Sequence, residues 1–243
     1  MKYTLCAAMA LLATLPAHAD DSATAGWNVG LAATVSQSPF VDGDAALSGK
    51  PVMLGNNEFD IAGPTLSLSA TPQREFYIGA GLDDWDYERG DSPTLQDMKS
   101  LDRAINLRVG GAWKLASGSA TVDLAQDVAG AHKGAQVKAR YTQRLAGSYA
   151  AVRPYMEAQW LSADMTDYYV GVDADEVKAG RPAYQADAAL ALKAGMLLEQ
   201  PISKRLTLVG EANVTGYDSA ISDSPIIDNS TIWGGAMGVA YRW

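Results

Sequence analysis

The sequence predicts an all-β fold, a transmembrane antiparallel up-and-down β-barrel. Three observations predict it: a secretory signal at the start of the chain, a long-range alternation of apolar and polar residues, and an alternation of short and long connections. Together these are typical of bacterial outer-membrane barrels. The alternating segments are compatible with twelve strands, and ten strands is the alternative.

Residues 1–19 have the layout of a signal peptide. Lys2 supplies a positive charge, residues 5–17 are apolar, and Ala17-His18-Ala19 is a small-x-small cleavage site. The apolar run is too short for a membrane-spanning helix, which needs about 20 residues. We therefore expect export to the outer membrane, with residues 20–243 forming a single barrel domain.

Composition and charge exclude several classes of protein. The chain has a formal charge of −9 and one cysteine, Cys6, which would leave with the signal peptide. The mature chain would then have no disulfide and depend on burial and hydrogen bonding. An acidic chain lacks the basic surface that nucleic-acid binding needs, so no nucleic-acid partner is expected. Beyond residue 19, no apolar run is long enough for a transmembrane helix.

The apolar residues beyond the signal follow a period of two. In residues 149–163, Met156 and Trp160 fall on one face, and Glu157 and Gln159 fall on the other. This alternation is typical of a strand with one apolar and one polar face. The same pattern recurs in residues 101–115, 134–147 and 203–217. These segments exceed the about 9–11 residues that a transmembrane strand requires.

The alternation places most of the strands. Residues 26–36 form the first, and eight more cover 75–87, 101–116, 119–129, 134–147, 149–163, 184–199, 203–217 and 229–243. Residues 48–70 are ambiguous, because one strand there would give ten and three short strands around Asn56-Asn57 and Gly63-Pro64 would give twelve. Both totals are even, as single-chain bacterial barrels require, and we prefer twelve.

Two segments depart from a simple strand pattern. Residues 186–198 are rich in Ala and Leu and also fit a helix, but Asp187 and Lys193 share one parity, which favours a strand. Pro154 lies inside a predicted strand, where a proline removes a hydrogen-bond donor from the ladder. We expect Pro154 to mark a bulge near the periplasmic rim.

The connections differ in length at the two ends of the strands. Residues 115–118 and 200–203 are tight, whereas 88–100, 164–183 and 218–228 are long and rich in Asp, Ser, Gly and Pro. Short turns at one rim and long loops at the other are typical of outer-membrane barrels.

The last residues of the chain carry a separate signal. From Trp233 onward, apolar or aromatic residues occupy every second position, and the chain ends with Tyr241, Arg242 and Trp243. This resembles the C-terminal signal that the barrel-assembly machinery recognises, although Phe is the usual last residue. Tyr241 and Trp243 would also suit an aromatic girdle at the membrane interface.

Several segments together resemble the MipA/OmpV family of outer-membrane proteins. They are Trp27–Leu31, Ser38-Pro39-Phe40, Leu101-Asp102, Tyr168-Tyr169-Val170-Gly171-Val172, Ala179–Tyr184 and Asp223–Asp228. One departure is Ala179, where the family often has Ser. The resemblance implies a scaffold that links a lytic transglycosylase to a bifunctional murein synthase. It also implies a link to adhesion or to the envelope response to antibiotics in some members.

The sequence offers little for catalysis. An enzyme acting on envelope lipids would need a base, and His132 is the only histidine that remains after the signal peptide. We expect His132 to be an exposed turn residue, far from Ser119 and Ser148. The chain is therefore predicted not to be an enzyme, and it receives no catalytic, cofactor-binding or metal-binding residue.

Two acidic groups are predicted to be solvated loops. One contains Asp83, Asp84 and Asp86, with Glu88 and Asp91 nearby; the other contains Asp173, Asp175 and Glu176. Neither has EF-hand spacing. Our hypothesis is that these acidic groups bind the divalent ions that bridge lipopolysaccharide, or cationic ligands such as polycationic antibiotics.

The predicted inner face carries charges of both signs, which we expect to pair across the lumen. The cations are Arg108, Lys138, Arg140, Arg144, Arg153, Lys193 and Arg205, and the anions are Asp123, Asp127, Glu157, Asp187, Glu199 and Glu211. Paired charges favour a plugged barrel over an open porin. The sequence thus favours a scaffold in contact with outer-membrane lipids and lipopolysaccharide, with a small channel or a surface protein as alternatives.

Overall fold

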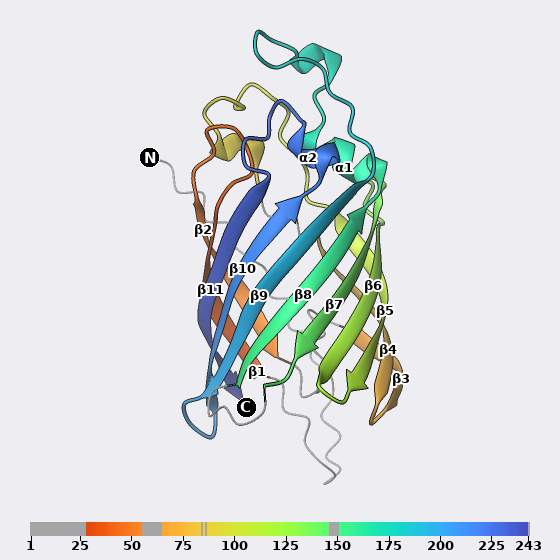
Figure 1. Cartoon of the computed structure of the whole chain (residues 1–243), viewed down its shortest axis with the longest axis vertical. Coiled ribbons are helices and arrows are strands. Elements are labelled where there is room, and N and C mark those ends of the chain that lie inside the picture. Colours follow the sequence, from red (N-terminus) through yellow and green to blue (C-terminus); the bar gives the residue numbers. More distant parts are fainter. Residues whose placement is uncertain (1–27, 55–64, 84, 86, 146–150, 243) are drawn as a thin grey trace.

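The computed structural model describes residues 28–54, 65–83, 85, 87–145 and 151–242. Within these residues, eleven strands form one antiparallel sheet (Figure 1). They are β1 (Asn28–Ser36), β2 (Ala46–Leu54), β3 (Thr65–Thr71), β4 (Arg74–Leu82), β5 (Ile105–Leu115), β6 (Gly118–Asp127), β7 (Ala135–Gln143), β8 (Ala151–Leu161), β9 (Ala189–Pro201), β10 (Leu206–Tyr217) and β11 (Thr231–Arg242). The signal peptide predicted at 1–19 lies outside the described residues.

The sheet curls into a barrel-like shape (Figure 1). From β3 to β11 each strand pairs with the next one in the chain, and β11 then pairs with β1, which pairs with β2. The pairing of β1 with β11 brings the two ends of the sheet-forming chain together, with Asn28 opposite Arg242. The order ends at β2 and β3, which are joined in the chain by residues 55–64, outside the described part.

The predicted totals of twelve and ten strands are both wrong for the described residues. Residues 48–70 were expected to hold one strand or three, and the structure has two there, β2 and β3. β2 was hidden because it begins before residue 48 and contains Gly49 and Pro51, which both weaken a strand pattern. The other nine strands are confirmed, and residues 189–201 form a strand rather than a helix.

Pro154 does not mark a bulge, so this prediction is also wrong. The pairing of β8 with β9 passes Pro154 without a shift in register, opposite Met196. The pairing of β8 with β7 ends at Tyr155, opposite Thr142. Pro154 therefore lies just beyond the ladder on that side, where the missing N–H breaks no pairing. The register shift that the structure does show lies in β3, between Ser67 and Ser69.

The two faces of the sheet are those that the alternation predicts. Leu107, Val122 and Met156 are exposed on the outer face. Their sequence neighbours Asp123 and Glu157 are buried on the inner face. Since side chains alternate strictly along a strand, the register fixes this separation for whole strands at once.

Two tyrosines on the inner face lie against glycines of the next strand. Tyr77 is paired with Gly110, and a side-chain carbon added there would lie 2.4 Å from the tyrosine ring. Tyr155 is likewise paired with Gly195, at 2.7 Å. The Tyr77 hydroxyl donates to Asp123. The glycines therefore leave the space in which these buried rings lie flat across the neighbouring strand.

We expect Gly110→Val to destabilise the sheet by about 1–3 kcal/mol, because the new side chain displaces the Tyr77 ring and breaks its hydrogen bond to Asp123. Urea unfolding of the refolded protein measures the change. Gly81→Val is the matched control, since an added carbon there meets nothing within 4 Å. Equal stability of the two variants would contradict the role of Gly110.

The long loops gather at one end of the sheet and fold into a cap, while the tight turns lie at the other end (Figure 1). The cap contains α1 (Ala163–Val170), α2 (Ser219–Ser222) and the 3₁₀ turns η1 (Arg89–Asp91) and η2 (Ala174–Glu176). Ser162 begins α1 by accepting a hydrogen bond from the Met165 amide, a typical N-cap. None of the helices in the described part of the chain is long and apolar enough to span a membrane.

Candidate functional site

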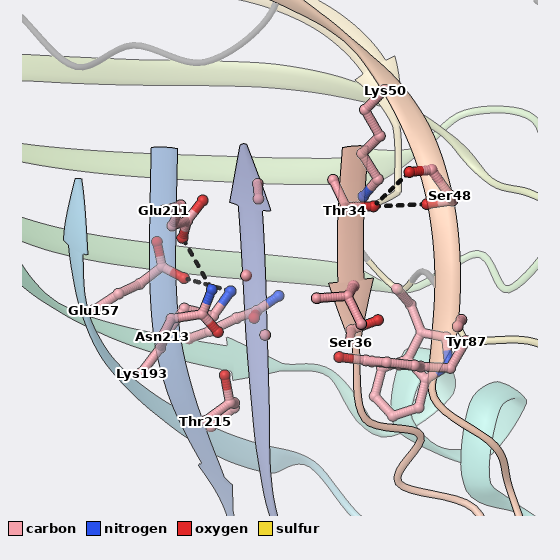
Figure 2. Close-up of a pocket in the computed structure, with 18 of the residues that line it drawn as sticks. Thr34, Ser36, Ser48, Lys50, Tyr87, Glu157, Lys193, Glu211, Asn213 and Thr215 are labelled. Carbon is pink, nitrogen blue, oxygen red and sulfur yellow. Dashed lines mark hydrogen bonds and ion pairs between the residues drawn. The ribbon is translucent and has the colours of Figure 1, made fainter. Parts of the chain in front are cut away.

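A cavity of about 690 Å³ lies inside the sheet, below the cap (Figure 2). It falls within the roughly 300–1,000 Å³ of typical ligand pockets. We call it the lumen chamber. Its lining comes from β1, β2 and β7–β11, and from the cap residues Trp85, Tyr87, Glu88, Asp91, Arg103 and Met165.

One wall of the lumen chamber carries mostly short side chains, together with the longer Lys50 of β2. Thr34 and Ser36 of β1 lie beside Ser48 of β2, and the Thr34 and Ser48 hydroxyls are 2.7 Å apart (Figure 2). Gly234 and Ala236 of β11 continue this wall. These small residues leave the space that longer side chains would fill. The sequence does show small residues at inward positions of the first and last strands. The alternation of inward and outward residues does not by itself reveal that these positions border a cavity.

The opposite wall carries a group of three charged residues. Arg140 of β7 contacts the Glu157 carboxylate of β8 at 2.8 Å, and the Lys193 ammonium of β9 lies 3.8 Å from the same carboxylate. The Arg140 guanidinium also stacks over the Tyr155 ring at 4.5 Å. Glu157 is therefore held between two cations on neighbouring strands, so its buried charge is compensated and the group of three keeps a net charge of one positive unit.

Several further inward charges pair, but they pair between neighbouring strands, whereas the prediction was pairing across the lumen. Arg108 contacts Asp123 at 2.9 Å, and Arg153 contacts Glu199 at 3.1 Å. Three residues predicted to be inside lie beyond the strand ends, and they are Arg144, Asp187 and Arg205. Asp127 makes no ion pair with another described residue, contrary to the prediction.

Asp127 instead stabilises the loop between β6 and β7. Its carboxylate accepts hydrogen bonds from the backbone amides of Ala129, Gly130, His132 and Lys133, at 2.9–3.0 Å. Four amide donors on one carboxylate fold residues 129–133 tightly, and Lys133 adopts a left-handed backbone with φ of 58°.

The prediction that His132 is exposed is wrong. His132 is 6% exposed, and its Nε2 lies 3.1 Å from Asp83 Oδ2. Its Nδ1 accepts a hydrogen bond of 2.9 Å from the Gly134 amide, so Nε2 carries the proton and donates to Asp83. Asp83 also accepts from the Tyr169 hydroxyl at 2.8 Å. Burial and the Asp83 carboxylate raise the pKa of Tyr169 above its ordinary value.

The acidic groups are not simply solvated loops, which corrects that prediction for Asp83 and Glu176. Both are buried, at 7% exposure. Asp173 and Asp175 are exposed and lie 2.9 and 3.3 Å from the Lys99 ammonium. Asp84 and Asp86 lie outside the described residues. Among the described residues, no three His, Cys, Asp or Glu side chains gather as a metal site would require.

Two buried arginines hold the cap together. Arg89 donates to the carbonyl oxygens of Tyr168, Tyr169 and Gly171 and lies 3.5 Å from the Glu176 carboxylate. Burial lowers the pKa of the Arg89 guanidinium, and Glu176 opposes that shift. This arginine thus connects η1 to the end of α1 and to η2.

Arg181 makes the second connection. Its guanidinium contacts both Asp97 carboxylate oxygens, at 3.0 and 2.6 Å, and the Glu176 carbonyl oxygen at 2.7 Å. The hydrogen bonds from Arg181 and from Lys178 hold the pKa of Asp97 well below its usual range. Loop 88–103 is thereby tied to loop 171–184.

The segments that resemble the family motifs meet inside this cap, although they are far apart in the sequence. Phe40, Tyr169, Val170 and Ile226 belong to one buried apolar cluster. The Ser224 hydroxyl donates to the Val170 carbonyl oxygen at 2.5 Å. The motifs therefore form the interior of the cap and its contact with the ends of β8 and β9.

We expect Arg89→Met to open the cap, because it leaves the Glu176 carboxylate buried without its cation, at a cost of about 3–5 kcal/mol. Limited proteolysis of the folded protein should then show cleavage in loops 88–103 and 164–187. Lys99→Met is the control, because an exposed ion pair contributes only about 0–1 kcal/mol. Unchanged protease resistance of Arg89→Met would contradict this role.

Comparison with known proteins places the chain among outer-membrane proteins. A family model described as MltA-interacting protein MipA matches residues 22–243. Outer membrane protein Omp26La of Vibrio anguillarum is 24% identical over 69% of this chain and 64% of its own length, so the match spans less than two thirds of that relative.

A second relative and one solved structure complete the comparison. Outer membrane protein YiaT of Escherichia coli O157:H7 is 22% identical over 91% of this chain and 93% of its own length. The crystal structure of a Pseudomonas aeruginosa FadL homologue matches with a TM-score of 0.37 and 8% identity, over 90% of this chain and 89% of the other.

Proposed function

Because this chain belongs to the MipA family of outer-membrane proteins, we propose that it is a closed barrel that serves as a non-enzymatic scaffold for murein-synthesising and murein-hydrolysing enzymes. The observation that carries the proposal is the combination of an apolar outer face with a cap that packs as a folded unit over one end of the sheet. The family is described as MltA-interacting, and this description supports a protein partner for the chain.

The outer face supports a membrane-embedded barrel. Many large apolar side chains are exposed there, and they include Leu31, Leu47, Leu66, Leu107, Val109, Val122, Leu124, Met156, Leu192, Met196, Val214 and Met237. An apolar surface of this extent is unfavourable in water and favourable in a bilayer. We therefore propose that the sheet closes into a barrel between β2 and β3.

Aromatic residues mark both edges of this apolar band. Trp160 and Trp233 lie near the cap ends of β8 and β11, and both are exposed. Phe76, Trp113 and Tyr241 lie near the opposite ends of their strands, and the rings of Phe76 and Trp113 are 5.9 Å apart. Two aromatic belts are typical of membrane barrels. The prediction for Tyr241 agrees with its outward position, whereas Trp243 lies outside the described residues.

We expect Met156→Arg to destabilise the protein in lipid vesicles by about 2–4 kcal/mol, because this outward residue lies near the middle of β8. Leu145→Arg, beyond the end of β7, should cost about 0–1 kcal/mol, as expected at the interface. Guanidinium titration in vesicles measures both values. Similar costs for the two variants would argue against a membrane-spanning β8.

The geometry of His132 supports a non-enzymatic role. A general base needs a free ring nitrogen that can take a proton from a substrate. One nitrogen of His132 accepts from the Gly134 amide, and the other lies against Asp83. His132 thus contributes to the cap rather than to chemistry.

The tight turns provide the surface for periplasmic partners, since short turns of outer-membrane barrels face the periplasm. Among the described residues at this end, the exposed charged side chains are Arg74, Arg144, Lys204 and Arg205. This basic rim contrasts with the acidic chain as a whole, which has a charge of −9. It would attract an acidic face of a partner enzyme.

The test is a binding assay with purified partners. We expect the refolded chain, immobilised in detergent, to retain a lytic transglycosylase and a bifunctional murein synthase in one complex. The double variant Lys204→Glu/Arg205→Glu should weaken retention by about tenfold, equal to roughly 1.4 kcal/mol.

Lys133→Glu, an exposed residue at the cap end, is the matched control and should retain both enzymes. Retention of neither enzyme by the unmodified chain would refute the scaffold proposal. Equal loss in the rim and cap variants would show that the charge of the rim is not what binds.

A further inference from the structure

The scaffold role leaves the lumen chamber without a function, although it is large and has a distinct chemistry on each wall. A barrel interior that only needed filling could do so with longer side chains on β1 and β11. Here the chain has Thr34 and Ser36 on β1 and Gly234 and Ala236 on β11. The space they leave lies opposite the charged wall.

The charged wall presents cations to the chamber and covers its carboxylate. The side chains of Lys193 and Arg140 are 30% and 23% exposed, whereas that of Glu157 is 6% exposed. The two cationic side chains are therefore more accessible than the Glu157 carboxylate, which also lines the chamber but is largely covered. A negatively charged group entering the chamber would meet the cations first.

The second carboxylate of this region is also occupied by the protein. Glu211 accepts a hydrogen bond from the Tyr155 hydroxyl and another of 3.1 Å from the Asn213 amide (Figure 2). These two donors satisfy its oxygen and reduce its pull on an incoming cation. The wall is thus better suited to accept an anion than its formal charges suggest.

The opposite wall offers small hydroxyl groups and the side chain of Lys50. Thr34, Ser36 and Ser48 lie there, and Thr215 of β10 adds a hydroxyl on the facing side, near Asn213 (Figure 2). Hydroxyls both donate and accept, so they suit a ligand that is itself hydroxylated. Tyr87 supplies an aromatic ring at the cap end of the same space.

The cap side of the chamber limits how much negative charge can enter. Glu88, Asp91 and Arg103 line it there, and all three are exposed. Two carboxylates beside one guanidinium repel an anion more strongly the more negative charge it carries, so they favour a monoanion over a polyanion.

From these features we infer that the lumen chamber binds a small hydrophilic carboxylate of sugar size, such as a sugar acid. Its carboxylate contacts Lys193 and Arg140, and its hydroxyls contact the β1–β2 wall. This binding site is independent of the scaffold role, because its residues lie inside the sheet and the basic rim lies at the turns.

The test is calorimetric titration of the full refolded chain in detergent with three matched probes. Glucuronate should bind saturably, whereas glucose, which lacks the carboxylate, should bind about tenfold more weakly or not at all. Glucosamine, with a positive charge, should not bind. Equal binding of all three probes, or no binding of glucuronate, would overturn the inference. Inorganic phosphate serves as a further control. If it bound as well as glucuronate, the site would be a general anion site and the sugar-acid class would be refuted.

Variants separate the chamber from the rest of the molecule. Lys193→Gln should weaken glucuronate binding by about tenfold, and Lys193→Arg should restore most of it. Ser36→Phe should abolish binding by filling the chamber, and Lys133→Gln at the cap should leave it unchanged. Protease resistance of each variant confirms folding, and retention of the murein enzymes by Lys193→Gln keeps this test distinct from that of the scaffold. Full glucuronate affinity in folded Lys193→Gln would refute the assignment.

Discussion

Strict alternation along the strands places the charged strand residues on the inner face, where only neighbouring strands can neutralise them. Arg140, Glu157 and Lys193 occupy successive strands at one level, and the two cations neutralise the buried carboxylate between them. A shift of one residue in any of these strands would bring its charge to the apolar outer face. The ion pairs and the apolar outer face therefore specify the same register, and each makes the other possible.

The cap depends on a different physical principle. Its loops have no repeating pattern, and their polar backbone is satisfied by buried arginines whose side chains reach several carbonyl oxygens at once. Arg89 contacts three carbonyl oxygens near the end of α1 and also Glu176. The aromatic cluster around Trp85, which stacks on Tyr169 at 4.9 Å, supplies the apolar part of the same unit. Loops that are individually irregular thus form one folded layer.

Features that depend on contacts between residues close in the sequence could be predicted, and features that depend on residues far apart in the sequence could not. The faces of β5, β7, β8 and β10 were correct because period-two alternation is local to each strand. β2 was missed because Gly49 and Pro51 interrupt that signal. The environment of His132 could not be predicted, because Asp83 lies 49 residues away and contacts it only once the cap has folded. The chamber was missed for the same reason, since one of its walls joins β1 and β2 to β11 from the other end of the chain, and the facing wall comes from β7, β8 and β9.

The acidic loops illustrate why composition alone does not define a binding site. The hypothesis that they bind external cations assumes available carboxylates, but Asp173 and Asp175 lie beside Lys99, and Asp97 lies beside Arg181 and Lys178. An external cation at these positions would have to compete with the chain's own cations and disturb the contacts that hold the cap. Asp84 and Asp86 lie outside the described residues, so cation binding at these two positions stays a prediction. On the charged wall of the chamber the arrangement is reversed, because there the Glu157 carboxylate is largely covered and two cations are presented, so this wall of an acidic protein suits an anion.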